Sequence, residues 1–364
     1  MEPPDTHKDQ HVAQECRDYD GDSDTHNQLL ERVQSIHRSS TNSRPKLDPS
    51  SYMFDGLKDE TVGKLPGALN GIQFIVQNCQ NCNIYLFDHT STVTVDDCTN
   101  CTFFIGPIKT SIFIRDCTGC KFVVACQQFR LRDCHKLEAF LCCTTQPIIE
   151  SSSGVRLACY TYFYPELPGQ FKAAGLSVFN NNWSNIHDFT QDATETHYTL
   201  LPDSTAVEDV VPLPTTEMFG GMQIDVSREK SVVPNSLGTR RKTSDESCLV
   251  VFFYDGSSQD RALTFIEEMR NHQCVLVQTK ELKMLPNDAQ RVFGSDMYNE
   301  AVSRGDVIGL EFNGVDAVQT CQEVVTRLTA GSTGVVFVSQ SREAAETQIT
   351  NYYDFADMQM SIDL

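Results

Sequence analysis

The residues that most readily suggest chemistry in this sequence are its cysteines, of which there are fifteen in 364 residues. Eleven of them lie between Cys79 and Cys159. Within that stretch, Cys79-x2-Cys82-x15-Cys98-x2-Cys101 matches the spacing of a zinc ribbon, in which four thiolates bind one Zn²⁺. A structural zinc site is therefore one interpretation of these cysteines.

The cysteine pairs continue beyond what one zinc site needs. A third pair, Cys117 and Cys120, follows at the same step of 19 residues, and Cys134 follows Cys117 by 17 residues. The three pairs supply six thiols, whereas a zinc site uses four. In the next repeat, Leu137 takes the place of the second cysteine. We therefore favour cysteines that point into a core as small apolar residues, without a metal, and keep zinc as the alternative.

Apolar residues repeat in step with the cysteines. Within each repeat they lie two residues apart, which is the period of a strand, and turn-forming Asp, Asn, Thr and Gly separate the segments. The columns are Phe74/Val93/Ile112/Phe129, Val76/Val95/Ile114/Leu131, Ile84/Phe103/Phe122 and Leu86/Ile105/Val124. Because one such turn cannot bury its own apolar side chains but a stack of turns can, the pattern is typical of a solenoid. We predict a right-handed parallel β-helix over residues 60–180.

A cationic position lies on the outward side of this predicted β-helix. Phe129 and Leu131 belong to inward columns, so the alternation places Arg130 and Arg132 on the outside. Four polar side chains of the same and the preceding turn surround this position: Thr110, Ser111, Gln127 and Gln128. An arginine that is merely solvated is the simpler interpretation of any one such residue, and only a partner can give the group a chemical role.

The composition excludes several classes of function. The net charge of −20 disfavours a nucleic-acid partner, because phosphate backbones would be repelled. No apolar run approaches the ~20 residues of a membrane helix. The start Met1-Glu2-Pro3-Pro4 does not resemble a secretory signal, so we expect a cytoplasmic protein with reduced cysteines. Glu2 stands where N-myristoylation needs Gly, and the absence of a Walker loop predicts no nucleotide cofactor of the chain's own.

Three regions of the chain differ in amino-acid composition and pattern. Residues 1–45 are polar and acidic, and we predict a disordered tail with one short helix near Leu29–Val33. Residues 46–235 hold the predicted β-helix and, from about residue 190, an acidic Pro-rich segment that we interpret as irregular structure and linker. Residues 236–364 form the last predicted domain.

Strand-like and helix-like segments alternate in residues 236–364. The alternation predicts an α+β domain of ferredoxin-like topology with its helices on one face of the sheet. The predicted strands are Cys248–Tyr254, Cys274–Thr279, Val307–Phe312 and Gly334–Ser339. The predicted helices are Gln259–Arg270, Asp288–Val302, Ala317–Leu328 and Arg342–Ile349.

The tripeptide Gln128-Phe129-Arg130 on a β-helix turn resembles the Gln-x-Arg motif of the tubulin-folding cofactor C domain family. Longer stretches are similar to the retinitis pigmentosa 2 family within it, and the similarity runs from about Lys46 to the C-terminus. These stretches are Tyr52–Val62, Ala125–Arg130, Gln146–Ser153 and Asn182–Phe189.

The resemblance implies a GTPase-activating protein. In that family an arginine finger is supplied in trans to an Arf-like small GTPase of the ADP-ribosylation factor-like protein 3 class, and the resemblance puts this role on Arg130. A guanidinium group suits it, since it is planar, always charged and able to bridge phosphate oxygens. Gln127 and Gln128 would place the finger and contact the nucleotide. Thr110, Ser111 and Phe129 would also lie at the nucleotide, and Glu150 and Arg132 at the partner interface. The partner would carry the GTP and Mg²⁺.

Two positions depart from the family pattern. The family usually has Gly where this chain has Thr110, and it begins Met-Gly-Cys where this chain begins Met-Glu-Pro, so we expect no dual-lipid anchor. The resemblance also implies traffic between the Golgi and the cilium or plasma membrane, with peripheral membrane attachment through partners, and allows a tubulin-related partner. The competing hypothesis is an effector or scaffold that binds the GTP form of an Arf-like GTPase without accelerating hydrolysis.

The last region resembles the nucleoside diphosphate kinase fold. The stretch Ser339–Glu346 is similar to the one that follows the phosphorylated His of that enzyme, but the matching position is Phe337. Moreover, no His occurs after His272. We therefore expect a catalytically degenerate domain kept for binding, in a chain that is not itself an enzyme.

Overall fold

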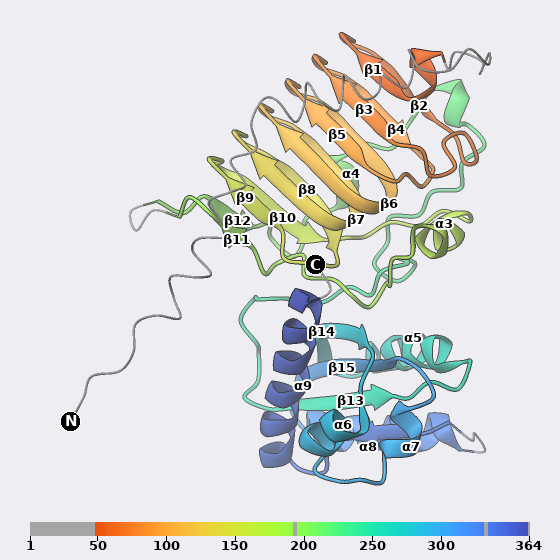
Figure 1. The fold of residues 1–364 in the computed structure, drawn as a ribbon, viewed down its shortest axis with the longest axis vertical. Coiled ribbons are helices and arrows are strands. Elements are labelled where there is room, and N and C mark those ends of the chain that lie inside the picture. The colour runs from red at the N-terminus through yellow and green to blue at the C-terminus, as the bar shows by residue number, and fades with distance from the viewer. Residues whose placement is uncertain (1–47, 192–194, 331–333, 363–364) are drawn as a thin grey trace. The chain divides into compact units, whose positions relative to one another are not determined.

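The computed structural model describes residues 48–191, 195–330 and 334–362, so the predicted tail of residues 1–45, with Cys16, lies outside the described residues. Residues from Pro49 onward form one compact unit, in which a solenoid of stacked strands precedes a four-stranded sheet with helices (Figure 1). The solenoid strands are β1 (Met53–Asp55), β2 (Thr61–Lys64), β3 (Phe74–Gln77), β4 (Asn83–Leu86), β5 (Val93–Asp96), β6 (Thr102–Arg115), β7 (Lys121–Arg132), β8 (Glu138–Cys143), β9 (Ile148–Glu150), β10 (Val155–Cys159), β11 (His187–Asp188) and β12 (Tyr198–Leu200).

All pairings within the solenoid are parallel. One path of paired strands runs β1-β3-β5-β6-β7-β8-β10-β12, while β2, β4 and β6 pair in sequence on another side, as do β7, β9 and β11. The registers match the columns expected from the sequence, for example Val93 opposite Ile112 and Ile112 opposite Phe129. The predicted parallel β-helix is therefore confirmed.

The corners of the solenoid explain why Asn or Asp precedes each first cysteine. Asn78, Asp97, Asp116 and Asp133 all adopt the left-handed conformation, with φ between 52° and 55°. Asn and Asp are among the few residues with a side chain that tolerate this region, because their short polar groups bond locally. Repeating these residues at one corner therefore lets every turn bend in the same place.

The cysteines behind these corners are buried thiols. Each donates its Sγ–H to the carbonyl two residues earlier, as from Cys98 to Asp96 (3.3 Å) and from Cys117 to Arg115 (3.1 Å). In the following turn Ser152 occupies the same place, and its hydroxyl donates to the carbonyl of Glu150 at 2.8 Å. The position therefore needs a small residue whose side chain donates a hydrogen bond. Burying the thiol of cysteine costs less free energy than burying the more polar hydroxyl of serine.

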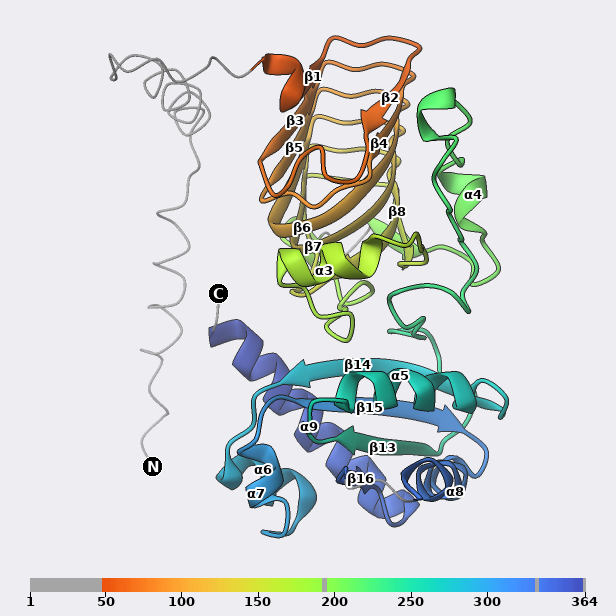
Figure 2. The same ribbon diagram turned by 90° about the vertical axis from the view of Figure 1, so that its right-hand side faces the viewer.

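A second apolar layer covers the outside of one solenoid face. Outward-facing Tyr85, Phe104 and Phe140 are buried beneath helix α3 (Leu167–Ala174) and a long strap of residues 201–233. The strap contains α4 (Val207–Val210) and a 3₁₀ turn η2 (Glu217–Phe219), and Figure 2 shows it lying along the solenoid. The acidic Pro-rich segment interpreted as a linker is therefore in large part a packed cover, because its apolar residues seal this face. Those residues are Leu201, Val207, Val210, Val211, Phe219 and Val233.

The C-terminal sheet is antiparallel, with strand order β14-β15-β13-β16. Its strands are β13 (Ser247–Phe252), β14 (Cys274–Leu282), β15 (Val307–Gly314) and β16 (Val336–Val338). Its helices are α5 (Ser258–Met269), α6 (Pro286–Phe293), α7 (Asn299–Val302), α8 (Ala317–Thr329) and α9 (Arg342–Ile362). The order of strands and helices confirms the predicted ferredoxin-like α+β topology.

The expectation that these helices share one face of the sheet is wrong. Helices α5 and α8 pack with Val250, Phe252 and the other residues of one sheet face, whereas α6, α7 and α9 pack on the opposite face. Both faces of the sheet are apolar because β13 reads as a continuous apolar run, Cys248–Phe253, which buries side chains on either side.

Two predicted helices also have the wrong limits. The helix expected over Asp288–Val302 is interrupted, because Gly294 takes a left-handed conformation (φ 67°) that ends α6. The helix expected to end at Ile349 continues to Ile362, since Tyr352, Phe355 and Ala356 extend its buried stripe.

The segment that follows α3 joins the edge strand β14. Asn180 donates its side-chain amide to the carbonyl of Glu281 (2.9 Å) and accepts from the N–H of Glu281 (2.8 Å), as a neighbouring strand would. Thr279 Oγ1 donates to the carbonyl of Phe179 at 2.6 Å, and the Phe179 ring is buried in the core beneath α5 and α8. These contacts cover an edge that would otherwise expose unpaired backbone groups.

Candidate functional site

Adjacent strands place a row of outward residues across the face of the solenoid that carries Arg130. Phe113 on β6 lies opposite Arg130 on β7, Arg130 lies opposite Ile148 on β9, and Ile148 lies opposite His187 on β11. The buried neighbours Phe129 and Leu131 fix this strand, so the orientation of Arg130 follows from the alternation expected in the sequence.

The exposed Arg130 side chain is held from its own strand and from the preceding turn. Arg130 Nη2 donates to Gln128 Oε1 at 3.1 Å, and the same oxygen accepts from Ser111 Oγ at 3.1 Å. Gln128 and Ser111 are paired residues on neighbouring strands, which makes this a support built into the sheet. The arrangement orients a cation toward solvent while keeping its main chain rigid.

The turn that carries Arg130 is shorter than the turn before it, and the shortening occurs at the site. Between β6 and β7 the register shifts twice, between Ile105 and Ile108 and again between Ile108 and Ser111. At each shift two residues of β6 face one residue of β7, which accounts for the step of 17 instead of 19. Such bulges redirect side chains, and here they lie directly before the paired Ser111 and Gln128.

The other polar residues predicted for this spot line the same corner. Thr110 Oγ1 donates to the carbonyl of Ser91 (2.8 Å) and lies 2.8 Å from Thr92 Oγ1. Gln127 is half-buried, and its carbonyl accepts from Thr145 Oγ1 at 3.1 Å. The structure therefore brings Thr110, Ser111, Gln127, Gln128 and Arg130 together around one corner. Phe129 is only 1% exposed, main chain included, so this residue of the predicted set is covered in the structure.

Glu150 and Arg132 lie opposite each other on β9 and β7. Arg132 nevertheless donates its Nε to Asp133 Oδ2 at 3.2 Å, which makes Asp133 its ion-pair partner, and Glu150 is exposed. Burial, and then the nearby Asp97 and Asp133, raise the pKa of Asp116 at the same corner column. An acidic edge thus borders the arginines.

The row contains aromatic residues that pattern reasoning did not select. Phe113 is 36% exposed and Phe189, just beyond β11, is 61% exposed. The His187 ring packs edge-on against Phe189 with ring centroids 4.5 Å apart. Phe113 could be found because it belongs to the repeat. Nothing periodic predicts Phe189, because the chain leaves the solenoid between β10 and β11 and returns only to pair with β9.

Two further findings bear on the kind of site. Within the described residues, no group of three or more His, Cys, Asp or Glu side chains is arranged to hold a metal ion. Among the described helices, none is long and apolar enough to cross a membrane.

Comparison with known proteins gives the relationships of the chain. Residues 71–189 match the family model described as tubulin binding cofactor C. The human protein XRP2 is 56% identical over 321 residues, which cover 88% of this chain and 91% of that protein. Among solved structures, tubulin binding cofactor C from Leishmania major is 21% identical, covers 45% of this chain and 93% of its own, and has a TM-score of 0.28.

A second solved structure is also similar to part of the chain. The nucleoside diphosphate kinase of Aquifex aeolicus is 14% identical, with a TM-score of 0.26, and the match covers 29% of this chain and 94% of that one. The identity to XRP2 extends over nearly the whole of both chains. This chain, whose residues 71–189 match the tubulin binding cofactor C model, therefore belongs to the XRP2 family.

Proposed function

We propose that this chain is a GTPase-activating protein for an Arf-like small GTPase and that Arg130 is its arginine finger. One observation supports this most directly. Arg130 points outward from a rigid strand while the Gln128 oxygen, itself fixed by Ser111, holds its guanidinium. An arginine that is only solvated needs no such support.

The chemistry of phosphoryl transfer explains why Arg130 would need to be held by Gln128. Negative charge spreads over the γ-phosphate oxygens in the transition state, and a guanidinium placed there in advance stabilises that charge. A finger of this kind is worth about 10³–10⁵ in rate, or roughly 4–7 kcal/mol of barrier. A loosely held side chain would lose part of this to the entropy of ordering, which the contact with Gln128 reduces.

The surrounding residues take the supporting roles. Gln127, Thr110 and Ser111 would contact the nucleotide of the bound GTPase, which also carries the Mg²⁺. Glu150 and Arg132 would contact the GTPase itself. The exposed Phe113 and Phe189 add apolar surface on the same face, which a protein partner can cover.

The C-terminal domain has a binding role in this proposal. Phe337 is buried on β16 at the position that the resemblance assigns to a phosphorylated His, so phosphate transfer through that residue is not open to this chain. The protein would act in traffic between the Golgi and the cilium or plasma membrane, at membranes through its partners. The description of the matched family, tubulin binding cofactor C, also allows a tubulin-related partner.

Single-turnover GTP hydrolysis by an Arf-like GTPase of the ADP-ribosylation factor-like protein 3 class tests the proposal. The wild-type chain should accelerate hydrolysis at substoichiometric amounts, and Arg130→Ala should abolish most of that acceleration. Lys172→Ala, on the exposed side of α3, is the matched control and should behave as wild type. Tight binding of the GTP form without any acceleration would instead indicate an effector or scaffold.

A further inference from the structure

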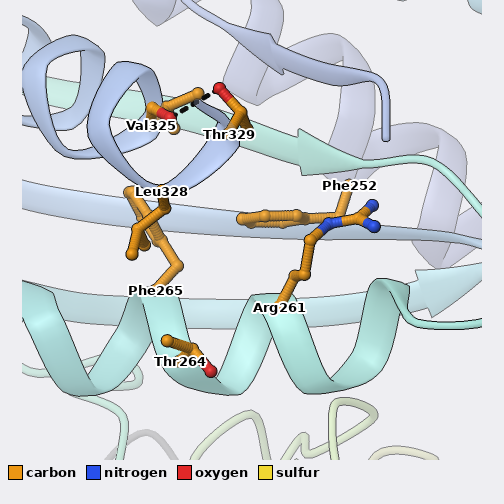
Figure 3. Close-up of a pocket in the computed structure, with 7 residues that line it drawn as sticks. All are labelled: Phe252, Arg261, Thr264, Phe265, Val325, Leu328 and Thr329. Carbon is orange, nitrogen blue, oxygen red and sulfur yellow. Dashed lines mark hydrogen bonds between the residues drawn. The ribbon is translucent and has the colours of Figure 1, made fainter. Parts of the chain in front are cut away.

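A small apolar cavity lies in the C-terminal domain, far along the chain from Arg130. Helices α5 and α8 form its sides and β13 its floor (Figure 3), and its volume is about 80 Å³. The Phe252, Phe265, Val325 and Leu328 side chains give it apolar walls. It lies on the face of the sheet opposite to α6, α7 and α9.

One charged side chain enters this apolar cavity. Arg261 rises from α5 beside the Phe252 ring (Figure 3), and its side chain is 18% exposed. Its Nη1 donates to Asp255. Its Nε and Nη2 are buried, and no hydrogen-bond partner for either lies in the described part of the chain. Buried donors on a cation are costly to leave without an acceptor, so this pair of nitrogens requires an explanation.

Nε and Nη2 lie on the same edge of the planar guanidinium group, so one N–H bond of each points in nearly the same direction. The same chain shows what that edge of the group binds, because Arg115 directs Nε to Asp96 Oδ1 (2.9 Å) and Nη2 to Asp96 Oδ2 (2.8 Å). Two parallel N–H···O bonds of this kind match the two oxygens of a carboxylate. Arg261 lines the cavity, and its own Nε and Nη2 have no acceptor among the described residues.

We propose that this cavity binds a small monocarboxylate with an apolar body. The carboxylate would accept from Arg261 Nε and Nη2, and the apolar body would lie against Phe252, Phe265 and Leu328. A single negative charge fits better than a phosphate dianion, because Asp255 already offsets part of the positive charge of Arg261.

Gly334 supplies the room that the guanidinium needs. A Cβ atom built on Gly334 would lie 2.4 Å from Arg261 Cζ, so any side chain there must displace the guanidinium. The nearest atoms are the flexible end of Arg261 and not backbone, so Gly334→Ala should fold while moving the guanidinium group out of place.

Ligand-detected NMR with the full chain tests the proposal, with hexanoate as the probe and hexan-1-ol and hexylamine as its uncharged and cationic matches. We expect hexanoate to bind at least about tenfold more tightly than either match, as charge-assisted bidentate bonds would give. A pentapeptide ending in Leu, with a free or an amidated C-terminus, distinguishes the source of the carboxylate. Tighter binding of the free peptide than of hexanoate would identify a protein C-terminus, and the reverse would identify a free acid.

Three variants separate the pair of guanidinium donors from mere positive charge. Arg261→Lys keeps the positive charge but lacks the pair of guanidinium donors, and Gly334→Ala displaces the guanidinium group. Each should therefore weaken hexanoate binding about tenfold or more. Asp255→Asn should instead strengthen binding, because it removes the anion that competes for Arg261. Arg304→Lys, at an exposed ion pair with Glu300, is the matched control. Equal binding of hexanoate and hexan-1-ol, or hexanoate binding unchanged in both Arg261→Lys and Gly334→Ala, would overturn the proposal. No GTPase enters these measurements, so their outcome is independent of the role of Arg130.

Discussion

At the scale of single residues, Gln128 is the group through which the sheet acts on Arg130. Its Oε1 accepts from both Arg130 Nη2 and Ser111 Oγ, so the amide is fixed before it fixes the guanidinium. The sequence could place these residues near one another from the alternation and the turn length. It could not show that the Gln128 oxygen accepts from both groups, because alternation specifies the face on which a side chain lies and not the hydrogen bonds that it makes.

Removal of the Gln128 amide should lower the maximal rate of GTP hydrolysis. In Gln128→Ala the finger keeps its charge but loses its acceptor, and a hydrogen bond to a charged group is worth about 1.5–3 kcal/mol, or roughly tenfold or more in rate. Arg130→Ala should cost more, about 10³-fold, and Ser111→Ala less than Gln128→Ala. Single-turnover rates at saturating activator give the comparison. An unchanged rate in Gln128→Ala would mean that the contact does not position the finger.

Glu150 should act on binding and not on the chemical step. It is exposed, and Arg132, its neighbour across the strands, forms its ion pair with Asp133. If Glu150 contacts the GTPase, Glu150→Ala should raise the concentration needed for half-maximal stimulation, with rate recovered at saturation. Arg130→Ala should lower the maximal rate and leave binding of the GTP form largely intact. A titration of both variants in the hydrolysis assay, beside a thermal melt, gives the test. A lower melting temperature for Glu150→Ala with unchanged half-saturation would indicate a structural role alone.

At the scale of elements, the solenoid corner explains the cysteine pairs without a metal. Each thiol donates to the carbonyl of its own corner, and Ser152 shows that a hydroxyl can do the same in one turn. Away from the corners, burial raises the pKa of Cys126 and of Cys142, so these two thiols stay protonated and unreactive at neutral pH.

The zinc alternative and the corner role predict different behaviour of Cys117→Ser. If the thiol is a corner donor, serine preserves the bond and the free energy of unfolding falls by only about 1–3 kcal/mol, the cost of burying a more polar group. Chelation by EDTA should then leave the denaturation midpoint of the wild type unchanged. Metal analysis that finds near-stoichiometric zinc, lost together with the fold in Cys117→Ser, would establish the zinc site instead.

The sequence predicted elements well where one local rule governs them and poorly where packing decides. The turns follow from a repeat of apolar pairs and left-handed Asn or Asp, and both signals are local. The sequence also contains the signal that interrupts the predicted helix 288–302, because Gly294 is a typical C-terminal cap. The extension of α9 beyond Ile349 depends on the packing of the Tyr352 and Phe355 side chains against the sheet, and periodicity alone does not specify that contact.

At the scale of the whole molecule, irregular segments join the parts that the sequence treated separately. The strap of residues 201–233 has almost no periodic pattern, yet its scattered apolar residues bury the outer face of the solenoid. No local rule predicts such a cover, since each contact is long-range and each residue alone looks like a loop residue. The same holds for Phe179, which follows the solenoid in sequence but lies in the core of the C-terminal domain.

Phe179 should therefore couple the unfolding of the solenoid to that of the C-terminal domain. Its ring is fully buried between elements of that domain, and the flanking Asn180 pairs with β14. Phe179→Ala should lower the free energy of unfolding by about 3–5 kcal/mol, the usual cost of removing a buried aromatic ring. Phe189→Ala makes the same substitution ten residues later at a ring that is 61% exposed, and should change stability by less than about 0.5 kcal/mol.

Two probes report on the two parts during urea denaturation. The single tryptophan, Trp183, is buried in the solenoid core, while most of the described helices belong to the C-terminal domain, so fluorescence and far-UV circular dichroism follow different regions. In the wild type the two transitions should coincide, as expected for one cooperative unit. In Phe179→Ala the circular dichroism transition should come first, because the C-terminal domain loses a core residue while the solenoid keeps its own core. Transitions that still coincide in Phe179→Ala, both displaced equally, would show that other contacts, such as the paired Asn180, suffice to hold the unit together.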